Sequence, residues 1–460
     1  MPQAATISGT QMLIGLGVGV VVLILLILKT KIHAFPAMIL AASITGLVGG
    51  MDPISISKSI TTGFGSTLGS IGLVIGFGVM MGRILEVSGA AERMALTFLK
   101  YLGARHPEWA MALTGYTVSI PIFCDSGFVI LTPLAKALAR KSGKSMLTMG
   151  VSLAIGLVAT HHLVPPTPGP LGTAGIFQAD IGQMILWGII FAIPVILVGV
   201  GYANWLGRKI YQQPTDDGKD WERLEWAPEL EKTISIEERK DLPSATLAFA
   251  PIIVPVILIL LNTVLTAMKA KGALATYLIF LGNPIIAVLV GLLLSIFGLG
   301  ATMDRKTILK RMEEGVQSAG IILLVTGAGG ALGQVLRDSG AGNYLAQVIS
   351  GTAVPAILLP FVVSTFIRLI QGSGTVAMLT SASITAPILA KLGVNPVFAA
   401  QSAAMGAFVF SYFNDSFFWV VNRMQGIEDV KEQIMTWSVP TTLAWLTSGI
   451  ALVIANAIFG

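Results

Sequence analysis

The chain has 460 residues, of which 54% are hydrophobic and 12% are charged, and its formal net charge is +5. A soluble domain carries about twice that charged fraction, so the composition excludes an ordinary soluble protein. The basic residues are not clustered with aromatic residues, which excludes a nucleic-acid-binding face, and one cysteine excludes an intramolecular disulfide.

Six long apolar runs predict membrane-spanning helices, because each approaches or exceeds the about 20 residues that a spanning helix needs. They cover residues 12–28, 35–51, 184–205, 251–266, 273–299 and 443–459. The chain is therefore predicted to be an all-α polytopic membrane protein. Lys29 and Lys31 follow the first run, so the positive-inside rule places the N-terminus outside the cell and this loop in the cytoplasm.

A glycine-spaced segment occurs twice in the chain. Residues 76–90 and 327–341 share seven identical positions at a constant offset of 251 residues. Further on, residues 125–127 correspond to 372–374, and 152–156 correspond to 402–406. Paired segments of this kind in a membrane protein predict two inverted-topology repeats. We assign the first half to residues 1–207, a polar cytoplasmic linker to 208–245 and the second half to 246–460.

The predicted elements follow the same order in each half. A glycine-rich helix precedes a polar stretch, a helix leading into a break, an exit helix and a helix that ends in a second break. The ranges are 63–81, 90–102, 109–124, 127–140 and 146–162 in the first half, and 321–336, 341–349, 355–371, 374–392 and 397–413 in the second. A second polar connector is predicted at 304–314. We interpret Gly76, Gly78 and Gly82 as close helix packing, because their spacing differs from the dinucleotide-binding pattern.

The first break contains one carboxylate, Asp125, among apolar residues. An ionised aspartate at the centre of a bilayer costs at least about 2.5 kcal/mol, so such a residue is usually functional. Pro121 weakens the helix before it and Gly127 permits a turn, while the helix that follows would point free N–H groups at a bound anion. The alternative is an aspartate that only caps this helix.

The matching break in the second half contains Arg368, Gln371, Gly372, Ser373, Gly374 and Thr375. Arg368 precedes the break by about one helical turn, and a guanidinium pairs bidentately with carboxylates. We expect Arg368 either to contact an anionic substrate or to pair with Asp125 or Asp415. A side chain that reaches the membrane surface is the remaining alternative.

The second break of each half differs in chemistry. In the first half, His161 and His162 precede a proline-rich segment, and they are candidates for a proton relay or for structural hydrogen bonds to backbone carbonyls. In the second half, Asn414 and Asp415 occupy the matching place among aromatic residues. A difference between the repeats is expected where one substrate binds at their interface.

The sequence shows no set of nucleophile, base and orienting residue, so we expect a protein that is not an enzyme. The four histidines lack zinc spacing, and we expect neither a metal nor a cofactor.

At these residues the chain resembles the gluconate:proton symporter (gluconate permease) family of the ion transporter superfamily. The resemblance covers nearly the whole chain and is specific when its matching stretches are taken jointly. These are 120–134, 164–170 with 174–182, 368–380, and 413–419 with 436–438.

The resemblance implies import of gluconate, related sugar acids, glycerate or D-serine across the bacterial inner membrane, driven by protons. It also implies re-entrant hairpins, a scaffold domain that mediates a homodimer, a transport domain and elevator-like movement. Gluconate-selective members often carry an aromatic-Glu-Val sequence where this chain has Cys124, Asp125 and Ser126, which indicates room for a different or larger substrate. The substrate residues that it implies are Asp125, Ser126, Gln371, Ser373, Asn414 and Asp415.

We therefore predict a symporter of a small hydroxylated carboxylate. Arg368 and the helix N-termini at Gly127 and Gly374 would bind the carboxylate, whereas Ser126, Ser373, Thr375 and Asn414 would bind hydroxyl groups. Asp125, Asp415, His161 or His162 would carry the proton, although backbone carbonyls near Ser126 and Ser373 leave sodium coupling open. Rival predictions are the membrane subunit of a sodium-pumping decarboxylase, with soluble partners, and a channel.

Overall fold

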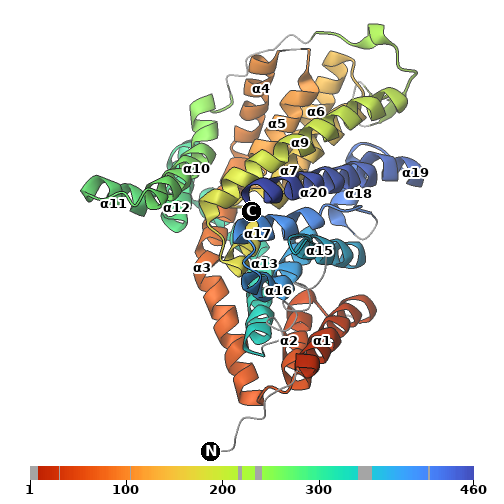
Figure 1. The fold of residues 1–460 in the computed structure, drawn as a ribbon. Coiled ribbons are helices and arrows are strands. Elements are labelled where there is room, and N and C mark those ends of the chain that lie inside the picture. Colours follow the sequence, from red (N-terminus) through yellow and green to blue (C-terminus); the bar gives the residue numbers. More distant parts are fainter. Residues whose placement is uncertain are drawn as a thin grey trace, which may run out of the picture.

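The computed structural model describes residues 9–30, 32–103, 105–215, 220–233, 241–339, 355–412 and 415–460, and they fold almost entirely as helices (Figure 1). The predicted polar stretch 341–349 lies outside the described residues. The elements of the first half are α1 (Gly9–Lys29), α2 (Ala34–Val48), α3 (Pro53–Val87), α4 (Ala90–Leu102), α5 (Pro107–Val118), α6 (Cys124–Ser142), α7 (Met146–Leu163), α8 (Pro168–Phe177) and α9 (Ile181–Lys209).

The second half follows the same order of long helix, interrupted helix pair, short buried helix and long outer helix. Its elements are α10 (Ala245–Ala267), α11 (Ala273–Leu281), α12 (Pro284–Phe297), η2 (Leu299–Thr302), α13 (Arg305–Asp338), α15 (Leu358–Gln371), α16 (Gly374–Lys391), α17 (Pro396–Gly406), α18 (Ser416–Met424), α19 (Val430–Gln433), the π-helical turn η3 (Ile434–Ser438) and α20 (Val439–Phe459). The inverted relation between the halves stays a prediction.

Two of the predicted segments that differ from the structure lie before α13 and at its start. The apolar run 273–299 is not one helix, because it turns at Gly282 and Asn283 into the separate helices α11 and α12. The predicted connector 304–314 is the first three turns of α13. Asp304 caps this helix by accepting hydrogen bonds from the Thr307 N–H (3.0 Å) and hydroxyl (2.6 Å), and these bonds lower the pKa of the Asp304 carboxyl. The charged composition of 304–314 was interpreted as a connector. A capped helix start can be charged, because the cap satisfies the first backbone N–H groups.

The connector between the halves also has structure of its own. It contains two short antiparallel strands, β1 (Gln212–Pro214) and β2 (Trp221–Arg223), and the single turn η1 (Pro228–Leu230). The hairpin reaches the second half of the chain, where the Gln212 side-chain amide donates to the Gln425 carbonyl (2.6 Å) and Arg223 pairs with Glu432 (2.5 Å). These contacts fix the hairpin against the second half of the chain, so the connector differs from a solvated linker.

Six helical segments of the described chain are long and apolar enough to cross a membrane, and the bent helix α3 would be a seventh. The predicted runs 184–205, 251–266 and 443–459 lie in α9, α10 and α20. Runs 12–28 and 35–51 form most of α1 and α2. The segments Met146–Phe177 and Arg305–Asp338 were not among the predicted runs, because polar residues interrupt their hydropathy.

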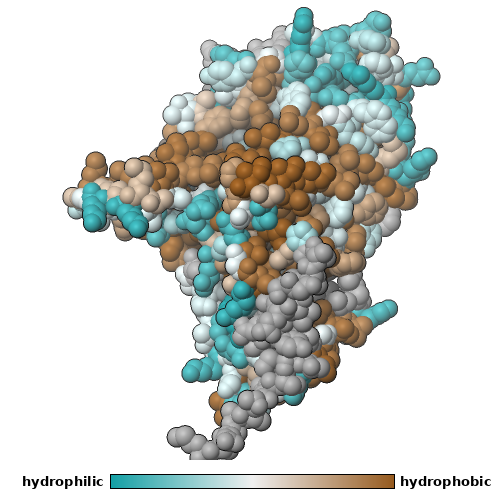
Figure 2. All heavy atoms as spheres, in the orientation of Figure 1, coloured by the Kyte–Doolittle hydropathy of each residue, from teal (hydrophilic) through white to brown (hydrophobic). Residues whose placement is uncertain are grey.

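Helix α7 forms the centre of the molecule, and each of its residues is buried. It packs against α5, α6 and α9, while the long helices α3 and α13 lie side by side at one flank. Figure 2 shows a hydrophobic surface across the middle of the molecule and hydrophilic residues gathered at the end where α4, α5 and the connector lie. This distribution is expected of a protein that spans a bilayer.

Candidate functional site

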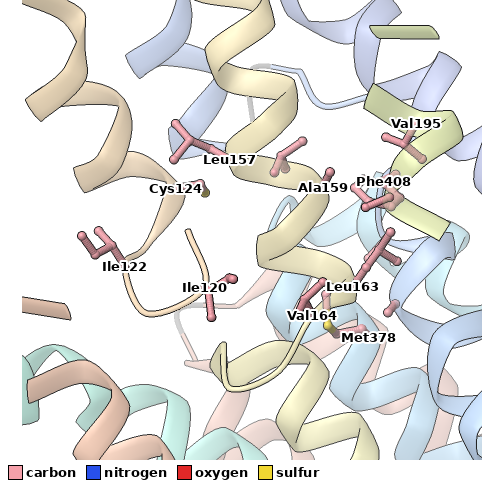
Figure 3. Packing of buried hydrophobic residues seen from close by; sticks show 14 of the residues in the cluster. Ile120, Ile122, Cys124, Leu157, Ala159, Leu163, Val164, Val195, Met378 and Phe408 are labelled. Atoms are coloured by element: carbon pink, nitrogen blue, oxygen red, sulfur yellow. The ribbon is translucent and has the colours of Figure 1, made fainter. Parts of the chain in front are cut away.

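The first interruption lies between α5 and α6 at residues 119–123, a few residues before the predicted break at 125–126, which belongs to the first turn of α6. The Ser119 hydroxyl donates to the Ile122 carbonyl (3.1 Å), so this backbone carbonyl of the loop has a hydrogen-bond partner. In Figure 3, Ile120 and Ile122 lie on this loop, Cys124 starts the helix that leaves it, and Leu157 projects from α7 beside them. The apolar side chains bury the loop, as irregular backbone in a membrane protein requires.

Helix α3 approaches this loop through Gly82. A Cβ added at Gly82 would overlap the Pro121 carbonyl oxygen and lie 3.1 Å from its carbonyl carbon. The predicted close packing is thus confirmed at Gly82. It is wrong for Gly76, where an added Cβ meets no atom of another described element within 4 Å, and Gly78 has only a contact at 3.9 Å with Pro166.

The second interruption separates α15 from α16 at Gly372 and Ser373. Gly372 has φ +88°, a left-handed conformation that glycine adopts without strain. Ser373 caps α16 through its hydroxyl, which accepts from the Val376 N–H (3.3 Å). The predicted boundary of the break is confirmed to within one residue.

The third interruption follows α17, which ends at Gly406 rather than at the predicted residue 413. Helix α18 then begins at Ser416, with Asp415 as its cap. The Asp415 Oδ1 accepts from the Phe417 N–H (3.1 Å). Aromatic and apolar composition suggested a longer helix, whereas the turn at 407–409 ends it early.

All three interruptions meet at one cavity of about 440 Å³. The helices α6, α16 and α18 begin at this cavity, so their unpaired N–H groups and positive dipole ends surround it. Ile321 and Val325 of α13 contribute apolar lining. The cavity brings together the predicted residues Asp125, His161, His162, Arg368, Gly372, Ser373, Gly374, Thr375 and Asp415.

Arg368 and Asp415 form a buried ion pair at the cavity. The Arg368 Nη2 lies 2.6 Å from the Asp415 Oδ2, and the side chains are 7% and 11% exposed. The Ser411 hydroxyl also donates to Asp415 Oδ2. Pairing with Asp415 was one of the alternatives for Arg368, and the structure shows this pair. Contact of Arg368 with an anionic substrate stays a prediction. The Nε and Nη1 atoms of Arg368 are buried and have no hydrogen-bond partner among the described residues. They remain available to an anion in the cavity.

Asp125 occupies the first turn of α6 and has different surroundings. Its Oδ2 accepts from the Ser416 hydroxyl (3.4 Å), and the Cys124 thiol lies 3.9 Å from its Oδ1. Within the described part of the chain, no lysine, arginine or histidine nitrogen forms an ion pair with Asp125. Of the two carboxylates at the cavity, Asp415 is therefore neutralised and Asp125 is not.

The two histidines are buried side by side at the end of α7. The His162 Nδ1 lies 3.1 Å from the Val158 carbonyl oxygen, which assigns the proton to Nδ1, and its ring stacks on Phe408 at 4.6 Å. His162 Nε2 and His161 Nδ1 have no partner among the described residues. The bond to Val158 supports the structural alternative for His162, and His161 stays a candidate for proton transfer.

Some predicted residues do not line this cavity. Ser126 faces a small hollow beside Gly82 and Gly315, and Gly127 packs against Leu157. Gln371 is described only in its backbone, as the last residue of α15, and Asn414 lies outside the described residues.

The sequence interpretation missed several residues that line the cavity, among them Ser416, Trp437 and Thr441. Trp437 belongs to the π-helical turn before α20, and Thr441 accepts through its hydroxyl from the Ser411 N–H (3.0 Å). The stretch 436–438 is one of those that carry the family resemblance. Its polar residues within an apolar run are the sequence signal that could have indicated these lining residues. π-helical turns in α-helices frequently mark functional sites.

The chain is similar to known proteins over nearly its whole length. Residues 11–458 match the family described as GntP family permease. A protein of Haemophilus influenzae named as an uncharacterized permease is 54% identical over 455 residues, which cover 97% of this chain and 93% of that protein. The gluconate permease of Pseudomonas aeruginosa is 35% identical over 419 residues, which cover 90% of each chain.

The fold is similar to that of a solved transporter. The crystal structure of the YdaH transporter of Alcanivorax borkumensis has a TM-score of 0.65 at 14% identity, covering 92% of this chain and 97% of that one. The apolar helices and these matches place the chain in the inner membrane as a multi-pass transporter, not an enzyme. The chain belongs to the GntP permease family.

Proposed function

We propose that the chain imports a small hydroxylated carboxylate together with a proton. The observation that supports this most directly is the buried Arg368, whose Nε and Nη1 have no partner among the described residues and which lines a cavity surrounded by three helix N-termini. Positive groups of this kind favour an anion. A relative at 35% identity is named a gluconate permease, which suggests a sugar acid as the anion.

The polar groups around Arg368 would select the rest of the substrate. Ser373 and Thr375 line the cavity at the start of α16, and Ser416 and Thr441 line it from α18 and α20. Their hydroxyls can donate to and accept from hydroxyl groups on the substrate. The cavity volume of about 440 Å³ accommodates a molecule of sugar-acid size.

Asp125 is our choice for the proton carrier. It lines the same cavity as Arg368 but has no cationic partner in the described chain, whereas Asp415 already pairs with Arg368. An unpaired carboxylate in a membrane interior binds a proton readily, because burial disfavours its charged form. Substrate and proton would then occupy adjacent groups in one cavity, which is what coupled transport needs.

The single cysteine provides a direct test of substrate binding. Cys124 lines the cavity next to Asp125, so a maleimide reacting with purified protein can modify only this residue. We expect gluconate or another sugar acid to slow the modification, and glucose, which lacks the carboxylate, to leave it unchanged. The Cys124→Ser variant controls for other labelling. Equal rates with every sugar acid, glycerate and D-serine would contradict the proposal.

A further inference from the structure

A second cavity lies at the polar end of the molecule. Its volume is about 770 Å³, and it shares no lining residue with the cavity that contains Arg368. Its walls come from the start of α5, the end of α9 and the connector after η1. The lining residues with charged or aromatic side chains are Arg105, His106, Glu108, Trp109, Lys144, Trp205, Arg208, Glu231 and Lys232.

The charges of this lining do not balance. Glu108 is 2% exposed and accepts from Lys144 Nζ at 2.7 Å, so this pair is neutral inside the protein. Glu231 lies at 4.0 Å from the same Lys144 nitrogen. Within the described ranges, Arg105, Arg208 and Lys232 form no ion pair. Three cations therefore face one remaining acid, and the cavity has a net positive charge with His106 neutral.

Arg208 makes a cation–π contact with an aromatic ring of the connector. Its guanidinium carbon lies 5.0 Å from the centroid of the Trp226 ring. A guanidinium that stacks on an aromatic face keeps its donors in its own plane, where they can bind a phosphate or carboxylate bidentately.

The cavity also lies where the lipid-facing surface of α9 ends. Leu186, Ile190, Ile193 and Leu197 are exposed at helical spacing, which is the pattern of a face that contacts lipid tails. Trp205, which is 50% exposed, follows on the same helix, and Lys209 Nζ lies 5.0 Å from its ring. Tryptophan beside lysine and arginine at the end of a spanning helix marks the headgroup level of a membrane.

We propose that this cavity binds the phosphate headgroup of an anionic phospholipid. The basic lining provides the charge, Trp109 and Trp205 provide the aromatic contact with the glycerol region, and the end of the apolar α9 face brings the lipid to the opening. Basic pockets between spanning helices on the cytoplasmic side bind anionic headgroups in this way. The site stands apart from the transport cavity and does not depend on the substrate.

The test uses the purified full-length protein after removal of lipid. Dioleoylphosphatidylglycerol, dioleoylphosphatidylcholine and water-soluble glycerol 3-phosphate are added separately, and bound lipid is counted by native mass spectrometry alongside thermal unfolding. We expect phosphatidylglycerol to be retained and to raise the unfolding temperature above the value with phosphatidylcholine. Glycerol 3-phosphate at the same concentration should have no effect, and an equal effect would contradict a lipid site.

Variants locate the effect at the cavity. Arg208→Gln combined with Lys232→Gln should retain phosphatidylglycerol about tenfold less well, because each cation contributes to the attraction. Lys232 lies outside the helices, so Lys232→Gln alone should leave folding unchanged. This single variant should show part of the loss of phosphatidylglycerol retention. The control is Arg305→Gln, which removes one exposed cation outside the cavity. The proposal would be overturned if the cavity variants retained phosphatidylglycerol as well as the unchanged protein. It would also be overturned if Arg305→Gln reduced retention equally.

Discussion

At the scale of single residues, the site is organised by the unequal neutralisation of two carboxylates. Asp415 accepts from Arg368, from the Ser411 hydroxyl and from a backbone N–H, whereas among the described residues Asp125 accepts from Ser416 and lies beside the Cys124 thiol. The negative charge of Asp415 is therefore compensated by Arg368 in the protein interior. Asp125 has no such compensation in the described chain, and this difference separates a positioning role from a proton-carrying role.

The Asp125→Asn variant tests the proton-carrying role. Asparagine keeps the shape of the side chain but cannot release a proton, so we expect substrate accumulation driven by a pH gradient to be abolished. Folding should be unchanged. Uptake into proteoliposomes with and without the gradient measures this, with Asp180→Asn as the control, since Asp180 caps α9 through the Gln183 N–H (2.8 Å) and asparagine caps equally well. Full accumulation by Asp125→Asn would remove Asp125 from the coupling mechanism.

The Arg368–Asp415 pair gives a second prediction. Removing one partner leaves a buried charge without compensation, so Arg368→Gln should destabilise the protein by about 3–5 kcal/mol. The double variant Arg368→Gln with Asp415→Asn leaves no charge and should recover a large part of this loss, yet it should not bind the anionic substrate. Chemical unfolding in detergent measures the stability, and substrate protection of Cys124 measures binding. Additive losses in the double variant would show that the two residues are not coupled.

At the scale of elements, the interruptions depend on close contact with neighbouring helices. The loop between α5 and α6 can lie against α3 because Gly82 has no side chain, and the Pro121 carbonyl occupies that space. The connector hairpin also makes close contacts with neighbouring elements, at the polar end of the molecule. Its Trp221 packs against Gly426, and Lys136 of α6 lies 4.6 Å from the Trp221 ring centroid. Helix α6, which carries Asp125 in its first turn, is thereby joined to the region that follows α18.

Two glycines of one helix provide a matched pair for the third prediction. Gly82→Ala places a methyl group on the Pro121 carbonyl and should destabilise the protein by about 1–3 kcal/mol while displacing the loop that leads to Asp125. Gly76→Ala adds the same atom where no atom of another described element lies within 4 Å and should have little effect. Thermal unfolding and the rate of Cys124 modification measure the two effects. Similar behaviour of both variants would contradict the packing argument.

At the scale of the whole molecule, one polar end is distinguished from the other by its basic residues. Arg105, Lys144, Arg208 and Lys232 lie around the cavity at the connector end, and Arg93 of α4 donates to the Pro243 carbonyl (2.6 Å) at the far side of the connector. Helix α3 runs from Pro53 to Val87 and ends beside this connector, since Gly89 contacts Leu242. The positive-inside rule assigns this end to the cytoplasm.

The fourth prediction concerns this orientation. Cysteine is introduced at Lys232 or at Lys58, both exposed, in the Cys124→Ser background. Because α3 has 35 residues and a rise of about 1.5 Å per residue, the two positions lie near opposite ends of the molecule. We expect an impermeant maleimide to label position 58 in intact spheroplasts and position 232 only in inside-out vesicles. The reverse pattern would invert the assignment and place the N-terminus in the cytoplasm.

The sequence by itself determined the class of protein, most of the helices and the approximate places where they break. Hydropathy and the residues Pro121, Gly372 and Ser373 act locally, because they change the stability of their own helical turn. The predicted turn at Gly127 was wrong, since Gly127 lies inside α6. The repeated order of elements followed from the same local signals. The predictions for residues 304–314 and 273–299 were wrong. The cap at Asp304 and the turn at Gly282 each involve few residues, so they leave a weak signal in the sequence.

The tertiary structure alone decided which of these residues meet and in what state of charge. The pairing of Arg368 with Asp415, the contact of Ser416 with Asp125 and the lining by Trp437 and Thr441 join different helices. Sequence spacing fixes neighbours along one helix only, whereas contacts between helices depend on how they cross and pack. The cavity at the end of α9 is a further example, because its cations come from the turn before α5, the loop between α6 and α7, α9 and the connector.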